Sequence, residues 1–283
     1  MEATHRHRDV AQSFGTDAEL YDRARPSYPA ELVSEIIDAS PGLDFLDVGI
    51  GTGLSARLFR DAGCRVLGVE VDERMAEVAR RHGFEVEASA FETWDPAGRQ
   101  FDAVTAAQAW HWIDPLAGAA KAAEALREGG VLAVFWNAFG LSQQLADAFA
   151  DVYRQVPNDL PFNPWAAPAL PNYEKMAQVA ADGMRKTGKF EEPQEFRVDW
   201  QHRSTREEWL SQVPTFGGHS RLPKTQLDAL LAGLGAVTPD TIDVNYTTVA
   251  MLARKMPSTS CDIKRENTYR ADPSASTRVT TSG

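Results

Sequence analysis

Three alternating glycines stand between an apolar run and a helical pattern, with acidic residues on either side. Residues 47–53 read DVGIGTG, and Glu70 closes the next apolar run. Glycines at such a turn let a ligand approach the backbone closely and leave the amides of a helix N-terminus facing it. A carboxylate at the end of the second strand can accept two hydrogen bonds from a ribose diol. The spacing therefore predicts a binding site for a molecule with an adenosine group.

The exact glycine spacing separates two classes of adenosine ligand. The dinucleotide motif G-x-G-x-x-G requires Gly or Ala where this chain has Leu54. Asp47 lies two residues before the first glycine, where a carboxylate would repel a pyrophosphate but suit an ammonium or sulfonium group. The chain also lacks the G-x-x-x-x-G-K-[ST] loop that binds triphosphates. The pattern favours S-adenosylmethionine over a nicotinamide dinucleotide.

Short apolar runs alternate with helical patterns around this loop, which predicts an α/β fold with a Rossmann-like, mostly parallel sheet and helices on both faces. The expected strands are residues 45–48, 66–70, 84–88, 101–104, 131–135, 196–200 and 242–252. The expected helices are residues 30–39, 54–62, 72–82, 115–126, 141–155, 173–185, 205–212 and 224–234. We expect one domain over residues 1–256, with its core at 40–140 and an inserted helical cap at about 141–222. Residues 257–283 are rich in Ser and Thr and are expected to be disordered.

The amino-acid composition limits the kinds of molecule that this chain is expected to bind. Lys and Arg number 29 against 40 Asp and Glu, a net charge of −11, which disfavours nucleic-acid binding because phosphate contacts depend on basic side chains. Cys64 and Cys261 fit neither a disulfide framework nor a zinc site, so no metal is expected. With no secretory signal and no run of 18 apolar residues, we expect a cytoplasmic protein without a membrane span, as a monomer or homodimer.

Several motifs in order resemble those of class I S-adenosylmethionine-dependent methyltransferases. They are residues 47–53, Glu70, residues 101–104 (FDAV) and residues 126–132 (LREGGVL). Three further segments resemble a small-molecule branch that includes trans-aconitate-methyltransferase-like proteins, namely 21–29 (YDRARPSYP), 107–112 (AQAWHW) and 215–223 (TFGGHSRLP). The core resemblance covers roughly residues 40–140. It implies a seven-stranded sheet whose last strand is antiparallel, and methyl transfer to a small-molecule acceptor with oxygen as the first choice.

The same resemblance assigns a cofactor site. Asp47 would attract the ammonium group of S-adenosylmethionine, directly or through water, and Glu70 would hold the ribose hydroxyls. The remaining contacts would come from backbone at Gly49, Ile50, Gly51 and Gly53, from Val71, Met75, Ala90 and Phe91 around adenine, and from Gln108 beneath the methionine group.

Aromatic residues and one histidine follow the predicted fourth strand. His111 could take a proton from an acceptor, since imidazole titrates near neutral pH. Trp110 and Trp112 could hold a flat acceptor and attract a sulfonium through their rings, and Trp136 could line the same pocket. The alternative for all four is a packing layer or helix cap, because buried aromatics are more often core residues.

Two segments outside the core offer further contacts. Tyr21, Arg25 and Tyr28 could form a lid in which Arg25 grips a carboxylate of the donor or the acceptor, or they could be a structural elbow fixed by the neighbouring prolines. His219 is a candidate for binding an acidic acceptor, although a surface-loop position is the default.

Three other functions are alternatives to methyl transfer. A nicotinamide-dependent oxidoreductase conflicts with Leu54 and with an antiparallel last strand. A non-catalytic S-adenosylmethionine-binding protein would keep the same pocket. Methylation of nucleic-acid bases is disfavoured by the charge and by the lack of an Asn/Asp-Pro-Pro-Tyr/Phe segment.

Overall fold

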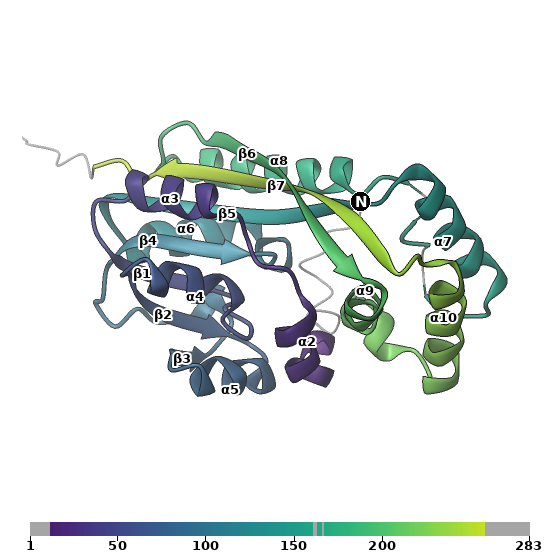
Figure 1. The fold of residues 1–283 in the computed structure, drawn as a ribbon. Helices are drawn as coiled ribbons and strands as arrows, with labels where there is room; N and C mark the ends of the chain where they lie inside the picture. The colour runs from purple at the N-terminus through teal and green to yellow at the C-terminus, as the bar shows by residue number, and fades with distance from the viewer. Residues whose placement is uncertain (1–11, 161–162, 166, 258–283) are drawn as a thin grey trace, which may run out of the picture.

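The computed structural model describes residues 12–160, 163–165 and 167–257 (Figure 1). A seven-stranded sheet runs through them in the order β3-β2-β1-β4-β5-β7-β6. The strands are β1 (Asp44–Val48), β2 (Arg65–Glu70), β3 (Glu85–Ala88), β4 (Phe101–Ala107), β5 (Leu126–Gly140), β6 (Gln194–Thr205) and β7 (Thr241–Arg254). Most of the predicted disordered tail, and Cys261, lie outside the described residues.

Strand direction confirms the predicted fold class. Strands β1 to β5 pair in parallel, β7 runs antiparallel to β5, and β6 runs antiparallel to β7. The winding direction reverses between β1 and β4. In open α/β sheets, ligands bind beyond the carboxyl ends of the strands at such a reversal.

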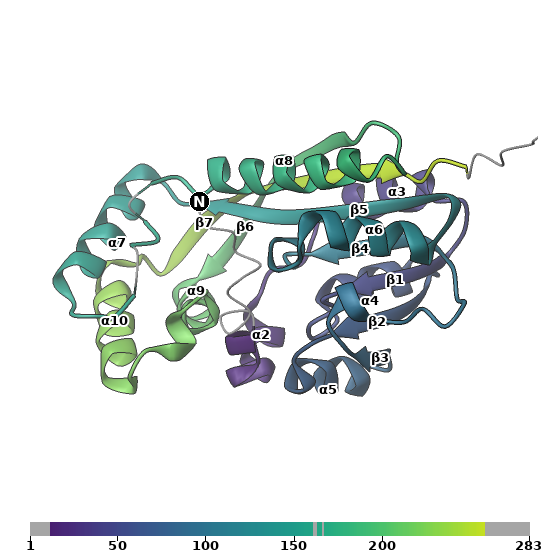
Figure 2. The same ribbon diagram turned by 180° about the vertical axis from the view of Figure 1, so that it is seen from behind.

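Helices cover both faces of the sheet. The α-helices are α2 (Ala18–Ala24), α3 (Ala30–Ala39), α4 (Leu54–Asp61), α5 (Glu73–Arg81), α6 (Pro115–Ala125), α7 (Gln143–Gln155), α8 (Leu170–Thr187), α9 (Arg206–Gln212) and α10 (Lys224–Val237). The 3-10 helices are η2 (Gln12–Asp17), η3 (Phe91–Thr93), η4 (Trp110–Trp112), η5 (Val213–Thr215) and η6 (His219–Arg221). Helices α3, α4 and α5 lie on one face, and α6 and α8 on the other (Figure 2).

Side-chain alternation along the strands divides the interior into two layers. Phe45 packs with Leu32 and Ile36 of α3, whereas its neighbour Leu46 packs on the α6 and α8 side. Because successive side chains of a strand point to opposite faces, a continuous apolar run fills both layers. This explains why the buried strands read as unbroken apolar segments.

The predicted helical cap is only partly helical. Within residues 141–222, β6 joins the edge of the main sheet and α8 packs on its face. The strands β5 and β6 are also longer than the expected 131–135 and 196–200. The outer residues of β6 are polar, and in β5 Asn137 and the glycines interrupt the apolar run, so the hydrophobic pattern predicts only the central part of each strand. Pairing with β7 supplies the backbone hydrogen bonds that keep them extended.

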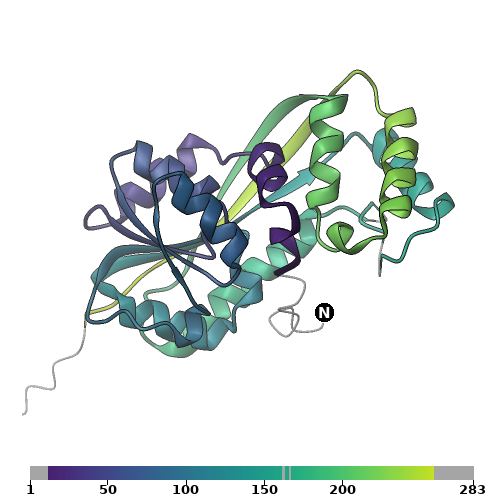
Figure 3. The same cartoon turned by 90° about the horizontal axis from the view of Figure 1, so that it is seen from below.

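A second apolar core lies away from the first. The far ends of β5, β6 and β7 carry α7, α9 and α10, and α2 lies between this group and the main sheet (Figure 3). Trp209, Phe149 and Leu230 are fully buried where these helices meet. The cap is therefore built on the same strands as the core, and α2 contacts both parts through α5 and α9.

The described residues include neither a helix that could span a membrane nor a group of side chains that could hold a metal ion. No helix there is long and apolar enough to cross a membrane. In the same part of the chain, no three His, Cys, Asp or Glu residues gather as they would to bind a metal ion.

Candidate cofactor and acceptor site

A cavity of about 900 Å³ opens at the carboxyl ends of four adjacent strands. Val48, Glu70, Ala88 and Ala107 are the last residues of β1, β2, β3 and β4, and all four line it. The opposite walls come from η2, α2, α8 and the segment around η5 and η6. The cavity thus lies where the sheet topology places a ligand site.

The glycine loop forms the floor of this cavity. Gly49, Gly51 and Gly53 have φ angles of +67°, +57° and +88°, a region that side chains rarely adopt. A methyl group on Gly49 would lie 2.5 Å from Cβ of Ala109. Only Gly49 and Gly51 border the cavity. Backbone therefore faces a bound molecule directly at these two positions.

Gly53 and Ile50 play structural parts that differ from the expected cofactor contacts. Gly53 caps α4, and a methyl group there would lie 2.9 Å from the Phe84 ring. The Ile50 side chain is 3% exposed and packs over Gly68 of β2. Neither residue lines the cavity, because the loop turns these positions toward α5 and the sheet.

Glu70 presents a fixed carboxylate at the cavity. Its Oε2 accepts a hydrogen bond from the Gly51 amide at 2.9 Å, and its Oε1 accepts from the amides of Val71 and Asp72, both at 2.9 Å. Burial raises the pKa of Glu70, an effect that these amides oppose. A carboxylate offers about four acceptor positions, so Glu70 can still receive a ligand hydroxyl.

Asp47 lies behind the loop and not on the cavity wall. Its carboxylate is fully buried and accepts hydrogen bonds from Ser55 Oγ at 3.0 Å and Thr105 Oγ1 at 2.9 Å. Burial raises the pKa of Asp47 to about 7. The geometry thus differs from a direct contact with a ligand ammonium. Asp47 instead ties the loop to α4 and β4.

Four predicted adenine contacts converge on one wall. Val71 and Met75 come from the start of α5, while Ala90 and Phe91 follow β3, and all four line the cavity. Phe91 stacks on Trp94, with 6.3 Å between ring centroids. Flat, apolar surroundings of this kind suit a planar base.

Gln108 marks the end of β4 with an unusual backbone. Its φ angle is +53°, although it is not a glycine. Its amide donates to Phe135 O at 2.9 Å, and its Nε2 donates to Asn137 O at 3.1 Å. These bonds to β5 keep Gln108 on the cavity wall beside Ala107 and Ala109. Strained non-glycine residues tend to occur at functional sites.

The three residues of the Trp-His-Trp sequence, 110–112, lie partly on the cavity wall and partly in the core. His111 and Trp112 line the cavity, whereas Trp110 is 2% exposed and packs with Phe91 in the main core. Trp136 is likewise buried, and its Nε1 donates to His111 Nδ1 at 3.1 Å. The expected acceptor contacts of Trp110 and Trp136 are thus replaced by packing, because their side chains point into the layer below α6 and α8.

The N-terminal segment places Tyr21 and Arg25 at the cavity and Tyr28 in the core. Tyr21 and Arg25 line the cavity. The Arg25 guanidinium lies 5.1 Å from the ring centroids of both Tyr21 and Phe216, and it donates to the backbone oxygen of Thr215. Tyr28 instead packs edge-on against Phe135 and lies outside this cavity, so its predicted acceptor contact is not what the geometry provides.

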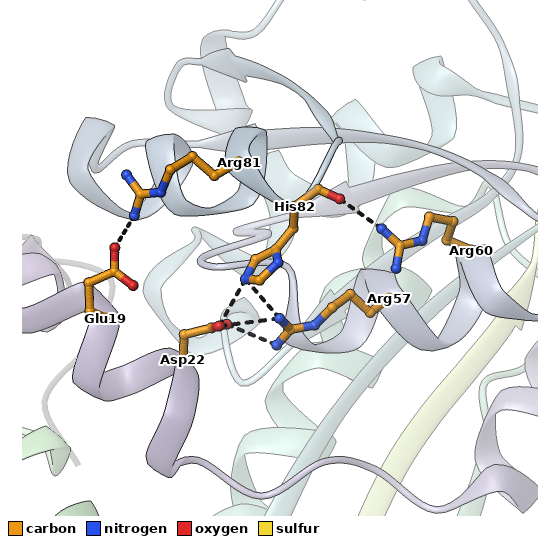
Figure 4. Close-up of polar contacts among 6 residues, drawn as sticks. All are labelled: Glu19, Asp22, Arg57, Arg60, Arg81 and His82. Atoms are coloured by element: carbon orange, nitrogen blue, oxygen red, sulfur yellow. Dashed lines mark hydrogen bonds and ion pairs between the residues drawn. The ribbon is translucent and has the colours of Figure 1, made fainter.

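Helix α2 is fastened to the core by charged side chains (Figure 4). The Asp22 carboxylate accepts two hydrogen bonds from Arg57 of α4, at 2.8 and 3.2 Å, and it lies 2.9 Å from His82 Nε2. A second ion pair joins Glu19 and Arg81 nearer the surface. Although burial alone would raise the pKa of Asp22, the bonds from Arg57 and His82 lower it.

Sequence reasoning missed the far wall. Tyr173 and Met176 of α8, Phe139 at the end of β5, and Phe216 after η5 all line the cavity. Of these four residues, only Tyr173 and Met176 lie in a helix that the sequence predicts, where their spacing indicates a shared apolar face. Which face α8 turns inward depends on how the cap folds back, and that is not encoded locally.

His219 is buried rather than exposed on a surface loop. It is 1% exposed, borders the cavity, and its Nε2 lies 2.6 Å from the Tyr153 hydroxyl. Burial lowers the pKa of His219 to about 4. The segment from Phe216 to Arg221 folds into tight turns that bring the ring inward.

Comparison with known proteins shows that the core of this chain is similar to methyltransferases. Residues 46–134 match the family model described as a methyltransferase domain. Uncharacterised methyltransferases of Mycobacterium bovis and Mycobacterium tuberculosis are each 36% identical to this chain over 132 residues, which is 46% of this chain and 54% of those proteins. The chain thus matches only about half the length of these curated relatives.

A solved structure shares the fold over most of the chain. It is described as a type II methyltransferase of Anaeromyxobacter dehalogenans, with a TM-score of 0.54 and 22% identity. The match covers 82% of this chain and 99% of that protein. At this identity the likeness concerns the fold alone, which supports the sheet order described above.

Proposed function

We propose, from the match of residues 46–134 to a methyltransferase domain and from the cavity beside the glycine loop, that this protein is a class I S-adenosylmethionine-dependent methyltransferase that transfers a methyl group to a small molecule, at an oxygen atom. The single observation that carries the proposal is one continuous cavity with two kinds of wall. One wall is the glycine loop and Glu70, and the other is an aromatic surface from the cap.

The residues of the first wall fit S-adenosylmethionine. Gly49 and Gly51 expose backbone, and Glu70 offers a buried carboxylate for a ribose diol. Among the described residues that line the cavity, Arg25 is the only Lys or Arg. A pyrophosphate would therefore meet a single cation near a buried acid, which disfavours a nicotinamide dinucleotide. The antiparallel β7 beside β5 also disfavours a dinucleotide-binding fold, because that fold has a mostly parallel sheet in the order 3-2-1-4-5-6.

When bound, S-adenosylmethionine supplies a methyl group activated by its sulfonium, and S-adenosylhomocysteine remains after transfer. The chain's own task is then alignment and exclusion of water. Val71, Met75 and Phe91 hold one end of a bound molecule, and Tyr21 and Arg25 cover the other. Effective alignment can contribute roughly 7–11 kcal/mol to such a reaction.

The second wall supports a small acceptor. Most of its members are apolar or aromatic, and Asn163, Asn172 and His219 add polar groups. The apolar and aromatic members are Trp112, Ile113, Phe139, Pro164, Ala167, Ala169, Tyr173, Met176 and Phe216. A pocket closed by α2, α8 and η5 suits a compact molecule better than a polymer surface. The preference for oxygen rests on the resemblance of residues 21–29, 107–112 and 215–223 to the small-molecule branch.

Binding and turnover separate the possible functions. We expect S-adenosylhomocysteine, but not NAD, to raise the melting temperature of the purified protein. We also expect a mass gain of one CH₂ unit on some member of an acceptor panel of carboxylic acids, phenols and alcohols.

Stabilisation by NAD alone would contradict the cofactor assignment. Tight binding of S-adenosylhomocysteine without turnover on any acceptor would favour a non-catalytic binding protein. Methylation confined to amines would retain the enzyme but overturn the choice of oxygen.

A further inference from the structure

Trp136 and His111 form a contact that the proposed function does not use. The indole nitrogen of Trp136, on β5, donates a hydrogen bond to Nδ1 of His111 in η4 at 3.1 Å. Trp136 is fully buried, while His111 lines the cavity. One residue therefore belongs to the core and the other to the site.

The chemistry of the two rings fixes the position of one proton. An indole N–H can only donate. Nδ1 of His111 must therefore offer its lone pair and cannot itself carry hydrogen. In a neutral imidazole, one nitrogen donates and the other accepts, so the proton of His111 lies on Nε2. Burial lowers the pKa of His111 to about 4, so the ring is neutral at pH 7.

Trp136 is placed rigidly enough to impose this choice. It lies opposite Val249 in the β5–β7 ladder and packs in the core beneath α6 and α8. A fully buried indole in a central strand cannot turn its N–H elsewhere without leaving that core. On the other side, Trp112 packs against the imidazole, with 4.5 Å between ring centroids. The orientation of the His111 ring is set by both tryptophans.

We infer that Trp136 is a positioning residue that holds His111 in the Nε2–H tautomer, so that His111 acts as a hydrogen-bond donor and not as a proton acceptor. The donor role toward an acceptor molecule rests on the proposed function, whereas the tautomer does not. With Nδ1 engaged and Nε2 protonated, neither ring nitrogen has a lone pair available to remove a proton. His111 would then orient an acceptor oxygen, and methylation would not depend on it as a base.

The tautomer can be measured in the free protein. In ¹⁵N-histidine NMR near pH 7, we expect His111 to show a protonated Nε2 and an unprotonated, hydrogen-bonded Nδ1. The Trp136→Phe variant keeps a buried ring but lacks the N–H, so the Nδ1 resonance should move toward that of a nitrogen without a donor. A proton on Nδ1 of the unmodified protein would overturn the inference.

Trp110 provides a matched control. It is buried beside the same helix, and its Nε1 has no hydrogen-bond partner among the described residues. Trp110→Phe should therefore leave both His111 resonances unchanged. An equal change in the two variants would indicate a general effect of core packing and would contradict a specific role for Trp136.

Activity gives a second, independent readout with any acceptor that the panel identifies. His111→Gln preserves a side-chain N–H donor, so kcat should stay within about tenfold, while His111→Leu should raise KM and lower kcat. A general base contributes about 10²–10⁴-fold to a rate. An equal loss of that size in both variants would show that His111 acts as a base. If neither variant turns over because the proposed function fails, the NMR result still decides the tautomer.

Discussion

Gly51 combines two requirements that only glycine meets. Its φ angle of +57° lies in the left-handed region, and its amide donates to Glu70 while its Cα faces the cavity. A side chain there would both strain the backbone and enter the space proposed for the cofactor. The strain alone costs about 1–3 kcal/mol.

Gly51→Val should therefore abolish binding of S-adenosylhomocysteine, with a loss of more than about 3 kcal/mol, or roughly a hundredfold. Isothermal titration calorimetry measures this loss. Gly83→Val is the control: Gly83 has a φ angle of +89°, but no atom lies within 4 Å of its added Cβ. We expect similar destabilisation and unchanged affinity in the control. Comparable losses of affinity in both variants would remove Gly51 from the site.

Helix α2 joins the site through residues on two of its faces. Tyr21 and Arg25 face the cavity, while Asp22 binds Arg57 and His82 of the core. The Asp22 side chain is only 12% exposed, and that of Arg57 is 22% exposed. Removing one partner of a shielded charge pair destabilises a protein more than removing one partner of an exposed pair, because the other charge is left buried without compensation. The position of the cavity residues therefore depends on this ion pair.

Asp22→Asn should lower the free energy of unfolding by about 1–3 kcal/mol and weaken binding of S-adenosylhomocysteine, because Tyr21 and Arg25 lose their support. Urea denaturation and calorimetry test the two effects. Glu19→Gln removes the outer pair with Arg81, whose side chains are more than half exposed, and should change stability by less than about 1 kcal/mol. Full affinity in the Asp22 variant would show that α2 is held by other contacts.

The local elements were largely predictable, and the far wall of the site was not. Helix α3 agrees with the expected 30–39 because its apolar spacing and flanking prolines are local signals. Glu70 and Gly51 were identified because the strand–loop–helix motif is contiguous in sequence. Trp112 and Trp136 are both tryptophans that come after apolar strand residues in the sequence, yet Trp112 lines the cavity and Trp136 is buried in the core. That difference depends on tertiary packing, which short-range patterns do not contain.

The stability of the whole molecule should depend on pH through two kinds of buried group, a carboxyl whose pKa is raised and imidazoles whose pKa values are lowered. Burial raises the pKa of Asp47 in the folded protein to about 7, above the usual aspartate value of 3.8. The unfolded chain releases this proton first, so the contribution of Asp47 lowers stability as pH rises from about 4 to 7. Burial gives His111 and His219 pKa values of about 4. These two histidines therefore stabilise the fold above about pH 6.5, and this stabilisation is lost as the pH falls from about 6.5 to 4.

Asp47→Asn isolates the first effect. Relative to the unmodified protein, the variant should gain about 2–3 kcal/mol in free energy of unfolding between pH 5 and pH 8, since one pKa unit corresponds to about 1.4 kcal/mol. Urea denaturation across this range measures the difference. The same variant keeps both histidines, so it should still lose stability below pH 6.5. A difference that does not vary with pH would mean that Asp47 is ionised throughout.

Strands β5 and β7 run without interruption from the glycine-loop core to the cap, paired from Val131 opposite Arg254 to Gly140 opposite Asn245. The walls that we propose for the donor and the acceptor therefore adjoin one continuous pair of strands. In directed evolution, the residues of one wall can therefore be varied while those of the other are kept. Randomising Tyr173, Met176 and Phe216 would reshape acceptor choice while the residues around Glu70 stay intact. Proteins built on this plan can diversify in what they modify while keeping the same donor.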